Sequence, residues 1–401
     1  MQRDIDDEQE AEVRSRVLRL LDEFRDAGER EFLGAQFDAG LTRIEYPPGC
    51  GGLGMEPKLQ QVIEEMLAAA GRRVPWTRNP MGIGMCSPTI VAFGTAEQKA
   101  RHLRPIHTSD ELWCQLFSEP DAGSDVASLS TRAVRDGGDW VVNGQKVWTS
   151  LAHEADFGLL IARTDPTVAK HKGLTAFILD MHVPGVQVRG LRKITGVSDW
   201  FNEVFLDDVR IPDSSRLGPV GEGWKVATAT LMNERVAIGG ELRGRGEGPI
   251  AAALEAWAAQ QEHDPVRRDQ LVKLWVSAEV LRLGAIRAQS LREQGVPGPE
   301  GSFLKLSYAM LRQQIAEFVV NLIGANGMLV WGYGPGAPFG EDPVLDFEDP
   351  VLTYLGVQCT TIAGGTSEIM RNILGERVLG LPREPGPDPG TPWNEIPRSV
   401  S

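Results

Sequence analysis

The sequence predicts an α+β protein in which two helical domains flank a central antiparallel β domain. Apolar residues recur at helical spacing over most of the first hundred residues. From about Leu112 they occur in short strand-like runs between turn residues, and after Gly221 the helical spacing returns. The expected divisions are an N-terminal helical domain at 1–111, a β domain at 112–220, a C-terminal helical domain at 221–382 and a flexible tail at 383–401.

The composition is that of a soluble globular protein, with 42% hydrophobic and 24% charged residues in a chain of 401. A formal charge of −14 argues against nucleic acid and anionic membranes as partners, and requires local donors for any anionic ligand. The chain lacks a long uncharged apolar run, and its acidic start lacks a signal core, so we expect a cytoplasmic protein. The four cysteines lie far apart without metal-ligand spacing, which predicts reduced thiols and no metal site.

The first domain is expected to be mainly helical. Apolar positions such as Val17, Leu21 and Phe24 recur at helical spacing between Glu8 and Ala35. A loop rich in glycine and proline follows. A second helical run is expected over 58–70, and a third helix is expected to begin near Thr95.

The β domain is expected to contain a tight hairpin near its start. Trp140–Val142 and Gln145–Trp148 have strand composition, and Asn143-Gly144 between them is typical of a type I′ turn. Further strands are expected at 157–162, 174–179, 186–188 and 203–206. In the third domain, 331–349 is expected to be a loop, and the proline-rich tail is expected to be extended or disordered.

Three short segments carry candidate chemistry. Residues 116–125 end a strand in a proline-glycine turn whose N–H groups and hydroxyls can face a phosphate, although an ordinary surface turn fits equally well. Residues 146–150 place Trp148 beside hydroxyls at a strand end, where tryptophan is more often a core or hairpin residue. Residues 362–369 form a glycine-rich turn that leads into a helix with free N–H donors.

In combination, order and spacing, these segments resemble the flavin-binding acyl-CoA dehydrogenases. The likeness extends through 202–212 and ends past Arg377, so it covers most of the chain. It implies the fold of that family, with a barrel-like β domain and a C-terminal four-helix bundle. It also implies FAD as cofactor, an acyl-CoA substrate desaturated between its α and β carbons, a role in lipid β-oxidation, and an electron-transfer flavoprotein as acceptor.

The resemblance also assigns contacts to individual residues. Trp148 would cover one face of the flavin, Ser150 would lie near its reactive nitrogen, and Ser124 would lie near the pyrophosphate or the substrate thioester. Many family members carry glutamine in place of Glu368, so this carboxylate is expected to point away from the pyrophosphate. The residues expected to bind the cofactor are Phe117, Ser118, Gly123, Ser124, Trp148, Ser150, Thr366 and Glu368.

The position of the catalytic base is the main departure. Many family members have a glutamate where this chain has Gly364, whose backbone N–H would still hold the thioester carbonyl. A stripe at helical spacing after Gly223 contains one acid, Glu234, and from the stripe alone a structural glutamate paired with an arginine is favoured. A subset of the family, however, places its base on this helix immediately before an arginine, as Glu234 precedes Arg235 in this chain. The resemblance therefore implies Glu234 as base and places Arg235 on the substrate side near Gly364.

The cofactor's adenosine end raises the question of a partner. The family's arginine-phenylalanine-glycine segment is missing from 246–268, and the glycine-rich partner loop is altered at 324–328. In this respect the chain resembles one subunit of heteromeric dehydrogenases that oxidise CoA esters with bulky, often steroid-derived, acyl groups. A homo-oligomer and a heterotetramer with a related subunit both remain open. The alternatives to a complete enzyme are a subunit that completes a partner's FAD site and a dehydrogenase of carrier-protein-bound acyl groups.

Overall fold

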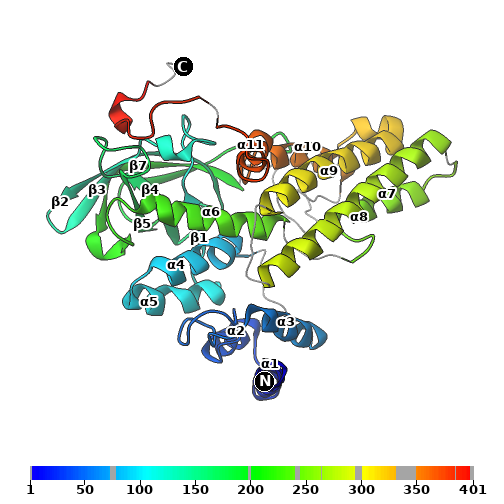
Figure 1. The fold of residues 1–401 in the computed structure, drawn as a ribbon, viewed down its shortest axis with the longest axis horizontal. Helices are drawn as coiled ribbons and strands as arrows, with labels where there is room; N and C mark the ends of the chain where they lie inside the picture. Colours follow the sequence, from blue (N-terminus) through cyan, green and yellow to red (C-terminus); the bar gives the residue numbers. More distant parts are fainter. Residues whose placement is uncertain are drawn as a thin grey trace.

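Three groups of elements make up the molecule, as Figure 1 shows: N-terminal helices, a β-sheet and a bundle of C-terminal helices. This computed structural model describes residues 2–72, 78–196, 200–239, 244–262, 264–293, 300–330, 349–383 and 385–397. The predicted α+β class is confirmed, with the sheet between the two helical parts of the sequence.

The described N-terminal part forms the α-helices α1 (Gln2–Glu23), α2 (Glu29–Asp38), α3 (Gln60–Ala69), α4 (Ser87–Phe93) and α5 (Ala96–His107). The helical pattern expected between Glu8 and Ala35 is broken, because Gly28 is extended and forms the N-cap of α2. The predicted start at Thr95 is confirmed. Its hydroxyl accepts from the Gln98 N–H at 3.2 Å, and the Gln98 side chain accepts from the Thr95 N–H at 3.0 Å, so a capping box begins α5.

The sheet is mostly antiparallel and, over its described strands, open rather than closed into a barrel. Its order is β6-β7-β3-β2-β4-β5-β8, with β1 parallel to β4. The strands are β1 (Trp113–Leu116), β2 (Arg132–Asp136), β3 (Asp139–Ser150), β4 (Phe157–Arg163), β5 (Leu174–Asp180), β6 (Val186–Gly190), β7 (Phe201–Pro212) and β8 (Arg216–Leu217).

The predicted hairpin at Asn143-Gly144 is wrong. These residues lie inside the single strand β3, and the chain turns instead at Gly137, whose φ is +62°, between β2 and β3. Asn143 hydrogen-bonds through its side chain to Asp208 of β7, and the register with β7 shifts between Val142 and Gly144. A Cβ at Gly144 would lie 2.3 Å from the Thr131 hydroxyl, so the glycine allows a close approach rather than a turn.

The C-terminal helices gather around one central helix, α9, which contacts each of the others. They are α6 (Gly223–Gly239), α7 (Pro249–Ala258), α8 (Pro265–Glu293), α9 (Glu300–Ile323), α10 (Pro350–Gly356) and α11 (Ser367–Arg377). Of the loop expected at 331–349, residues 331–348 lie outside the described residues. Asp349 caps α10 by accepting from the Val351 N–H at 2.8 Å.

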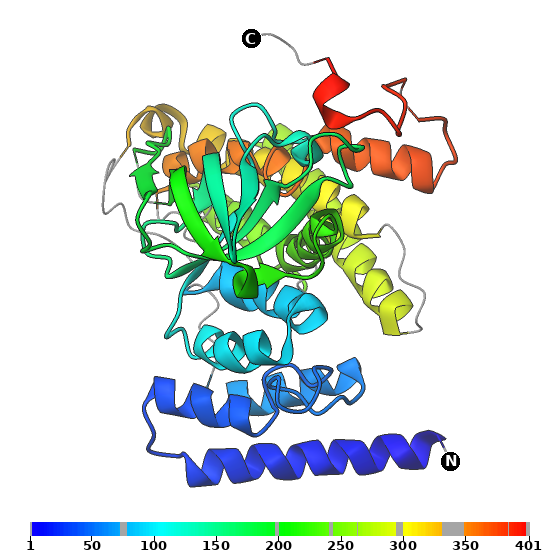
Figure 2. The same ribbon diagram turned by 90° about the vertical axis from the view of Figure 1, so that its left-hand side faces the viewer.

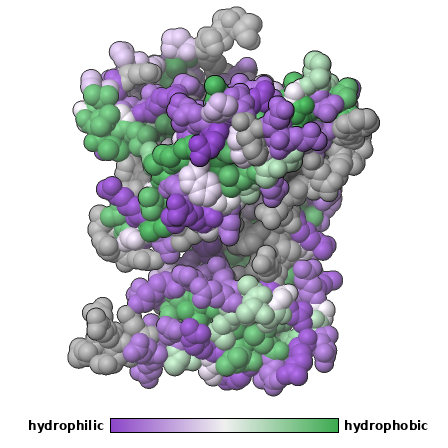
Figure 3. Space-filling view, turned by 90° about the vertical axis from the view of Figure 1, so that its right-hand side faces the viewer, coloured by the Kyte–Doolittle hydropathy of each residue, from purple (hydrophilic) through white to green (hydrophobic). Residues whose placement is uncertain are grey.

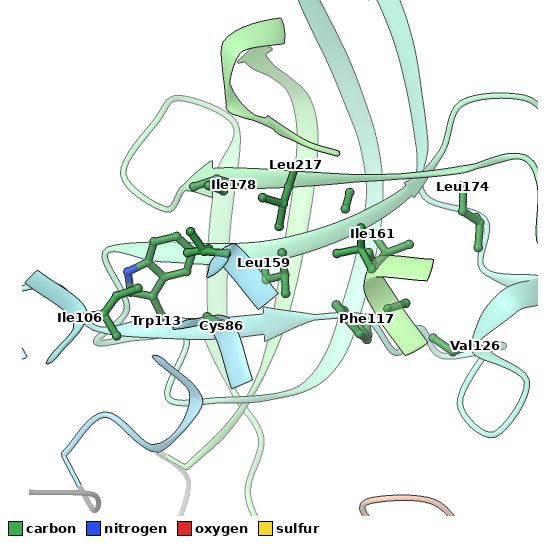
Figure 4. Packing of buried hydrophobic residues seen from close by; sticks show 14 of the residues in the cluster. Cys86, Ile106, Trp113, Phe117, Val126, Leu159, Ile161, Leu174, Ile178 and Leu217 are labelled. Atoms are coloured by element: carbon green, nitrogen blue, oxygen red, sulfur yellow. The ribbon is translucent and has the colours of Figure 1, made fainter. Parts of the chain in front are cut away.

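One hydrophobic cluster joins the domains beneath the sheet. Figure 4 shows Cys86 and Ile106, from the N-terminal part, beside Trp113 of β1, while Phe117 lies farther along the same cluster near Ile161 of β4. The buried residues Val226 and Ala227 of α6 complete this cluster from the C-terminal side. The end of β1, where the candidate site begins, is therefore fixed by apolar packing among residues of all three domains.

The tail departs from its prediction. It was expected to be extended or disordered, but residues 392–394 form backbone hydrogen bonds and a β-bridge with the loop that follows β4. The Trp393 N–H donates to the Val168 carbonyl at 2.9 Å, and the Asn394 N–H donates to the Pro166 carbonyl at 3.1 Å. Figures 1 and 2 both show this C-terminal segment, in red, beside the sheet.

Cys50, Cys86, Cys114 and Cys359 are all free thiols, as the sequence predicted. Within the described part of the chain, every helix is too short or too polar to cross a bilayer.

Candidate functional site

Two of the predicted segments lie side by side at the end of β1. The Val147 N–H donates to the Ser118 carbonyl at 2.9 Å, which ties the segment after β1 to the last part of β3. Phe117 is buried in the domain-joining cluster, whereas Ser118 is only partly covered. The segments that contain Ser118 and Trp148 are therefore neighbours; Phe117 is buried, whereas Ser118, Trp148 and Ser150 are at least partly exposed.

The Trp148 side chain is exposed to solvent beside the Ser118 segment. Its φ is +59°, an uncommon conformation for a bulky residue, and its side chain is 61% exposed. The ring meets the edge of Phe201, with ring centroids 6.0 Å apart, and the register of β3 with β7 is irregular between Lys146 and Thr149. A strained backbone that presents a large ring to solvent is typical of a ligand-contacting residue.

A buried ion pair, which the sequence did not reveal, connects the two segments. Lys146 is fully buried, and its ammonium donates to the Phe117 carbonyl at 3.0 Å and to the Glu119 carboxylate at 2.9 Å. Burial lowers the pKa of Lys146 despite its carboxylate partner. Burial also acts to raise the pKa of Glu119, but the charge of Lys146 and the surrounding hydrogen bonds leave that pKa below its ordinary value. The ammonium and the carboxylate are thus each other's main compensation for burial.

Glu119 also shapes the turn that carries Gly123 and Ser124. Its carboxylate accepts from the backbone N–H groups of Ser130, at 2.6 Å, and Thr131, at 2.9 Å. Its own backbone forms a bridge with Ala122. The loop is thus fixed at both ends, while Gly123 and Ser124 are exposed at its tip. Only the pairing of β1 with its neighbours brings these charges together, so sequence alone gave no signal for them.

The glycine-rich turn packs against α9. Gly364 and Gly365 have φ of +67° and +95°, and Thr366 caps α11 by accepting from the Ile369 N–H at 3.2 Å. The ammonium of Lys305, a buried residue of α9, donates to the Gly365 carbonyl. The turn is therefore anchored to the central helix of the bundle. Glu368 is exposed and pairs with Arg371 of the same helix at 3.3 Å.

The helix with the candidate base connects the sheet to the bundle. The first half of α6 packs Val226, Ala227 and Leu231 against the domain-joining cluster. The same helix contacts β5 on one side and α9 on the other. Glu234 and Arg235 belong to α6, but their side chains lie outside the described residues. The helix of Glu234 and the turn of Gly364 therefore share α9 as a neighbour.

The structure also describes most of 246–268 and all of 324–328, the regions expected to differ from the family at the adenosine end of the cofactor. Residues 249–258 form α7, and residues 324–328 form a short 3-10 turn that follows α9 directly. Gly324 has a φ of +61° in this turn.

The three parts of the chain match the three domains of a known protein family. Three family models match in order: acyl-CoA dehydrogenase N-terminal domain over 1–110, middle domain over 114–209 and C-terminal domain over 221–379. The chain is 38% identical to acyl-CoA dehydrogenase IpdE1 of Mycobacterium tuberculosis (strain ATCC 25618 / H37Rv), with 86% of each covered. It is 40% identical to FadE34 of the same organism over 86% of this chain, but spans only 45% of that relative's length.

A solved structure has the same architecture. The "Tcur3481-Tcur3483 steroid ACAD" matches with a TM-score of 0.72 and 27% identity, covering 94% of this chain and 98% of that one. Family models and relatives agree over nearly all of the sequence. The chain therefore belongs to the acyl-CoA dehydrogenase family, whose members are flavoprotein oxidoreductases that act on CH–CH groups.

Proposed function

We propose that the chain is an FAD-dependent acyl-CoA dehydrogenase that introduces a double bond between the α and β carbons of an acyl thioester. The observation that carries this proposal is the surface formed by Ser118 and Trp148, with an exposed ring on strained backbone beside a fixed loop. Family membership supports the same chemistry.

The described groups fit a flavin nucleotide. An exposed indole suits stacking on a flat ring, and the partly exposed Ser118 and Ser150 lie in the two segments that meet beside it. Gly123 and Ser124 at the loop tip, together with Thr366 at the start of α11, provide N–H and hydroxyl donors for a pyrophosphate. When bound, FAD supplies the acceptor for the hydrogen that leaves the β carbon as hydride. Phe117, buried under this surface, supports it from behind.

We assign the proton chemistry to two residues from different elements. The Gly364 N–H would polarise the thioester carbonyl, and a glycine with φ of +67° keeps this donor close without a side chain in the way. Glu234 on α6 would accept the α-proton, with Arg235 beside it on the substrate side. Glu368 is already paired with Arg371 on the surface, so it serves the start of α11 rather than the proton transfer.

The assignment of Glu234 is tested by substrate-dependent bleaching of the flavin. Glu234→Gln should retain flavin absorbance but bleach at least about 100-fold more slowly, the lower end of what a general base contributes. Glu222→Gln is the matched control, because Glu222 lies at the start of the same helix and pairs with Lys225 at the surface. Undiminished bleaching in Glu234→Gln would rule out Glu234 as the base.

We further propose a bulky, steroid-type acyl group and assembly with a second subunit. The structural relative Tcur3481-Tcur3483 is a steroid ACAD whose name joins two chains, and this chain lacks the family's usual adenosine contacts. On α8, Val272, Val276, Val280 and Leu283 share one face and are about half exposed, which suits a contact with another protein. Figure 3, which views the molecule from the side of the C-terminal helices in Figure 1, shows several separate apolar patches among polar residues. An electron-transfer flavoprotein would accept the electrons.

Expression with and without a related dehydrogenase subunit tests this assembly. We expect the chain alone to purify with little flavin and the co-expressed complex to be flavin-saturated. A flavin-saturated, active homo-oligomer of this chain alone would contradict the need for a partner. The missing adenosine contacts also favour a second candidate, a non-catalytic subunit that completes a partner's FAD site. In that case the complex would turn over equally well with Glu234→Gln.

A further inference from the structure

The C-terminal segment reaches back to the loop that carries Ser124. The family match ends at residue 379, so 385–397 lie beyond it. Within this segment the backbone of Pro392 forms a bridge with Ala169, and Trp393 and Asn394 donate to carbonyls of the loop after β4. The segment is therefore attached to the β domain by backbone pairing.

Arg163, at the end of β4, is the centre of this contact. Its guanidinium is buried and donates to the Leu129 carbonyl at 3.1 Å and to the Ala127 carbonyl at 2.6 Å. A third bond, 3.1 Å long, reaches the Lys170 carbonyl. One side chain thus joins the end of the Ser124 loop to the loop after β4.

Trp393 covers this guanidinium from outside. Its ring centroid lies 4.2 Å from the guanidinium carbon, a cation–π distance. The indole N–H donates to the Ser128 carbonyl at 3.2 Å, between the two carbonyls that Arg163 holds. The ring therefore shields the arginine and adds a bond to the same loop.

An ion pair links the same two loops nearer the tip. The Lys170 ammonium lies 2.7 Å from the Asp125 carboxylate, and the Ser128 hydroxyl also donates to that carboxylate at 2.5 Å. Asp125 directly follows Ser124. The position of Ser124 consequently depends on the loop after β4, to which the C-terminal segment is attached.

We propose that Trp393 is a positioning residue, through which the C-terminal segment holds the 123–130 loop in the shape that presents Gly123 and Ser124 to the cofactor and thioester. This inference rests on the proposed function for the identity of the ligand. The holding of the loop rests on the contacts alone. Trp393 acts through Arg163 and Ser128, and it does not touch the ligand itself.

Hydrogen exchange tests, without cofactor or substrate, whether Trp393 holds the 123–130 loop in place. In the full-length chain, Trp393→Ala should speed amide exchange across 123–130, while the melting temperature changes little. Trp393→Phe retains the ring but loses the N–H donor, so its effect should be intermediate. Arg383→Ala is the control, because Arg383 pairs with Glu376 of α11 and belongs to the same C-terminal stretch. Unchanged exchange at 123–130 in Trp393→Ala would overturn the proposal.

The flavin-loaded enzyme tests the consequence for the ligand. Trp393→Ala should raise the KM for acyl-CoA or the Kd for FAD roughly tenfold, the size expected for one buried cation–π contact, with kcat nearly unchanged. Faster exchange with unchanged KM and Kd would overturn the positioning role, even though the segment holds the loop. Failure of the proposed function would appear differently, as no acyl-CoA turnover in the unsubstituted chain.

Discussion

At the scale of single residues, the buried charges of the candidate site are its most constrained feature. Lys146 is fully buried, and Glu119 satisfies it while accepting two backbone N–H groups. Removing one partner of such a pair leaves an uncompensated charge in a medium of low polarity, which costs more than the pair itself contributes. The two side chains therefore act as one unit.

Glu119→Gln should lower the free energy of unfolding by about 3–5 kcal/mol, because Lys146 would be left buried without its carboxylate partner. The double variant Glu119→Gln with Lys146→Met should recover much of this loss, since no buried charge remains. Urea denaturation of both variants measures the difference. A loss below about 1 kcal/mol in the single variant would show that buried Lys146 does not depend on the Glu119 carboxylate.

His107 gives the fold a pH dependence. Burial, and next the charge of Arg104, lower the pKa of this side chain from 6.5 to about 4. As pH falls, the His107 side chain takes up its proton at a higher pH in the unfolded chain than in the folded one. The stability of the folded state is therefore unaffected by this group above about pH 6.5 and decreases as pH falls toward 4. The loss should approach roughly 3 kcal/mol, and it should be absent in His107→Gln.

Unfolding measured between pH 7 and pH 4 checks this expectation. His182→Gln is the control, because that ring is largely exposed and contacts Asp156 at the surface. If His107→Gln keeps the full slope of the unsubstituted protein, another group is responsible for it.

At the scale of elements, local patterns predicted most of the structure. The strands expected at 157–162 and 174–179 appear as β4 and β5, and the helix start at Thr95 is confirmed by its capping box. The hairpin at Asn143-Gly144 failed, because a tertiary contact with Thr131 selects glycine there while Gly137 makes the turn. Turn composition alone does not distinguish these two uses of glycine.

Gly144→Ala tests this explanation of the strand. A Cβ there would lie 2.3 Å from the Thr131 hydroxyl, so we expect destabilisation of about 1–3 kcal/mol by overpacking. Gly138→Ala is the matched control in the nearby turn, where a Cβ meets nothing within 4 Å. Thermal unfolding of the two variants compares them directly. Equal melting temperatures would mean that the close approach is unimportant.

At the scale of the whole molecule, long-range contacts set the limit of prediction. The segments around Ser118 and Trp148 were proposed from sequence and lie side by side, but the ion pair of Lys146 with Glu119 was not predicted, because it depends on strand order. The tail was likewise expected to be extended or disordered because of its prolines, whereas Trp393 packs on Arg163 across more than half of the chain. Composition describes local preference and does not reveal a distant partner.

The α6 helix and the Gly364 turn, far apart in the sequence, are both attached to α9. The helix packs on α9, and the turn is anchored to the same central helix through Lys305. A base on α6 and a carbonyl-holding N–H at Gly364 would therefore approach one substrate from two elements. We propose that the base lies on α6, at Glu234, rather than at position 364.

Exchange of the substrate's α-hydrogen with solvent reports on this base. The flavin-loaded complex would be incubated in D2O with saturated acyl-CoA esters, including one with a steroid-derived acyl group, and deuterium incorporation would be followed by mass spectrometry. We predict α-deuteration by the unsubstituted protein and by Glu222→Gln, and at least about 100-fold slower deuteration by Glu234→Gln. Equal rates in Glu234→Gln and the unsubstituted protein would show that Glu234 is not the base.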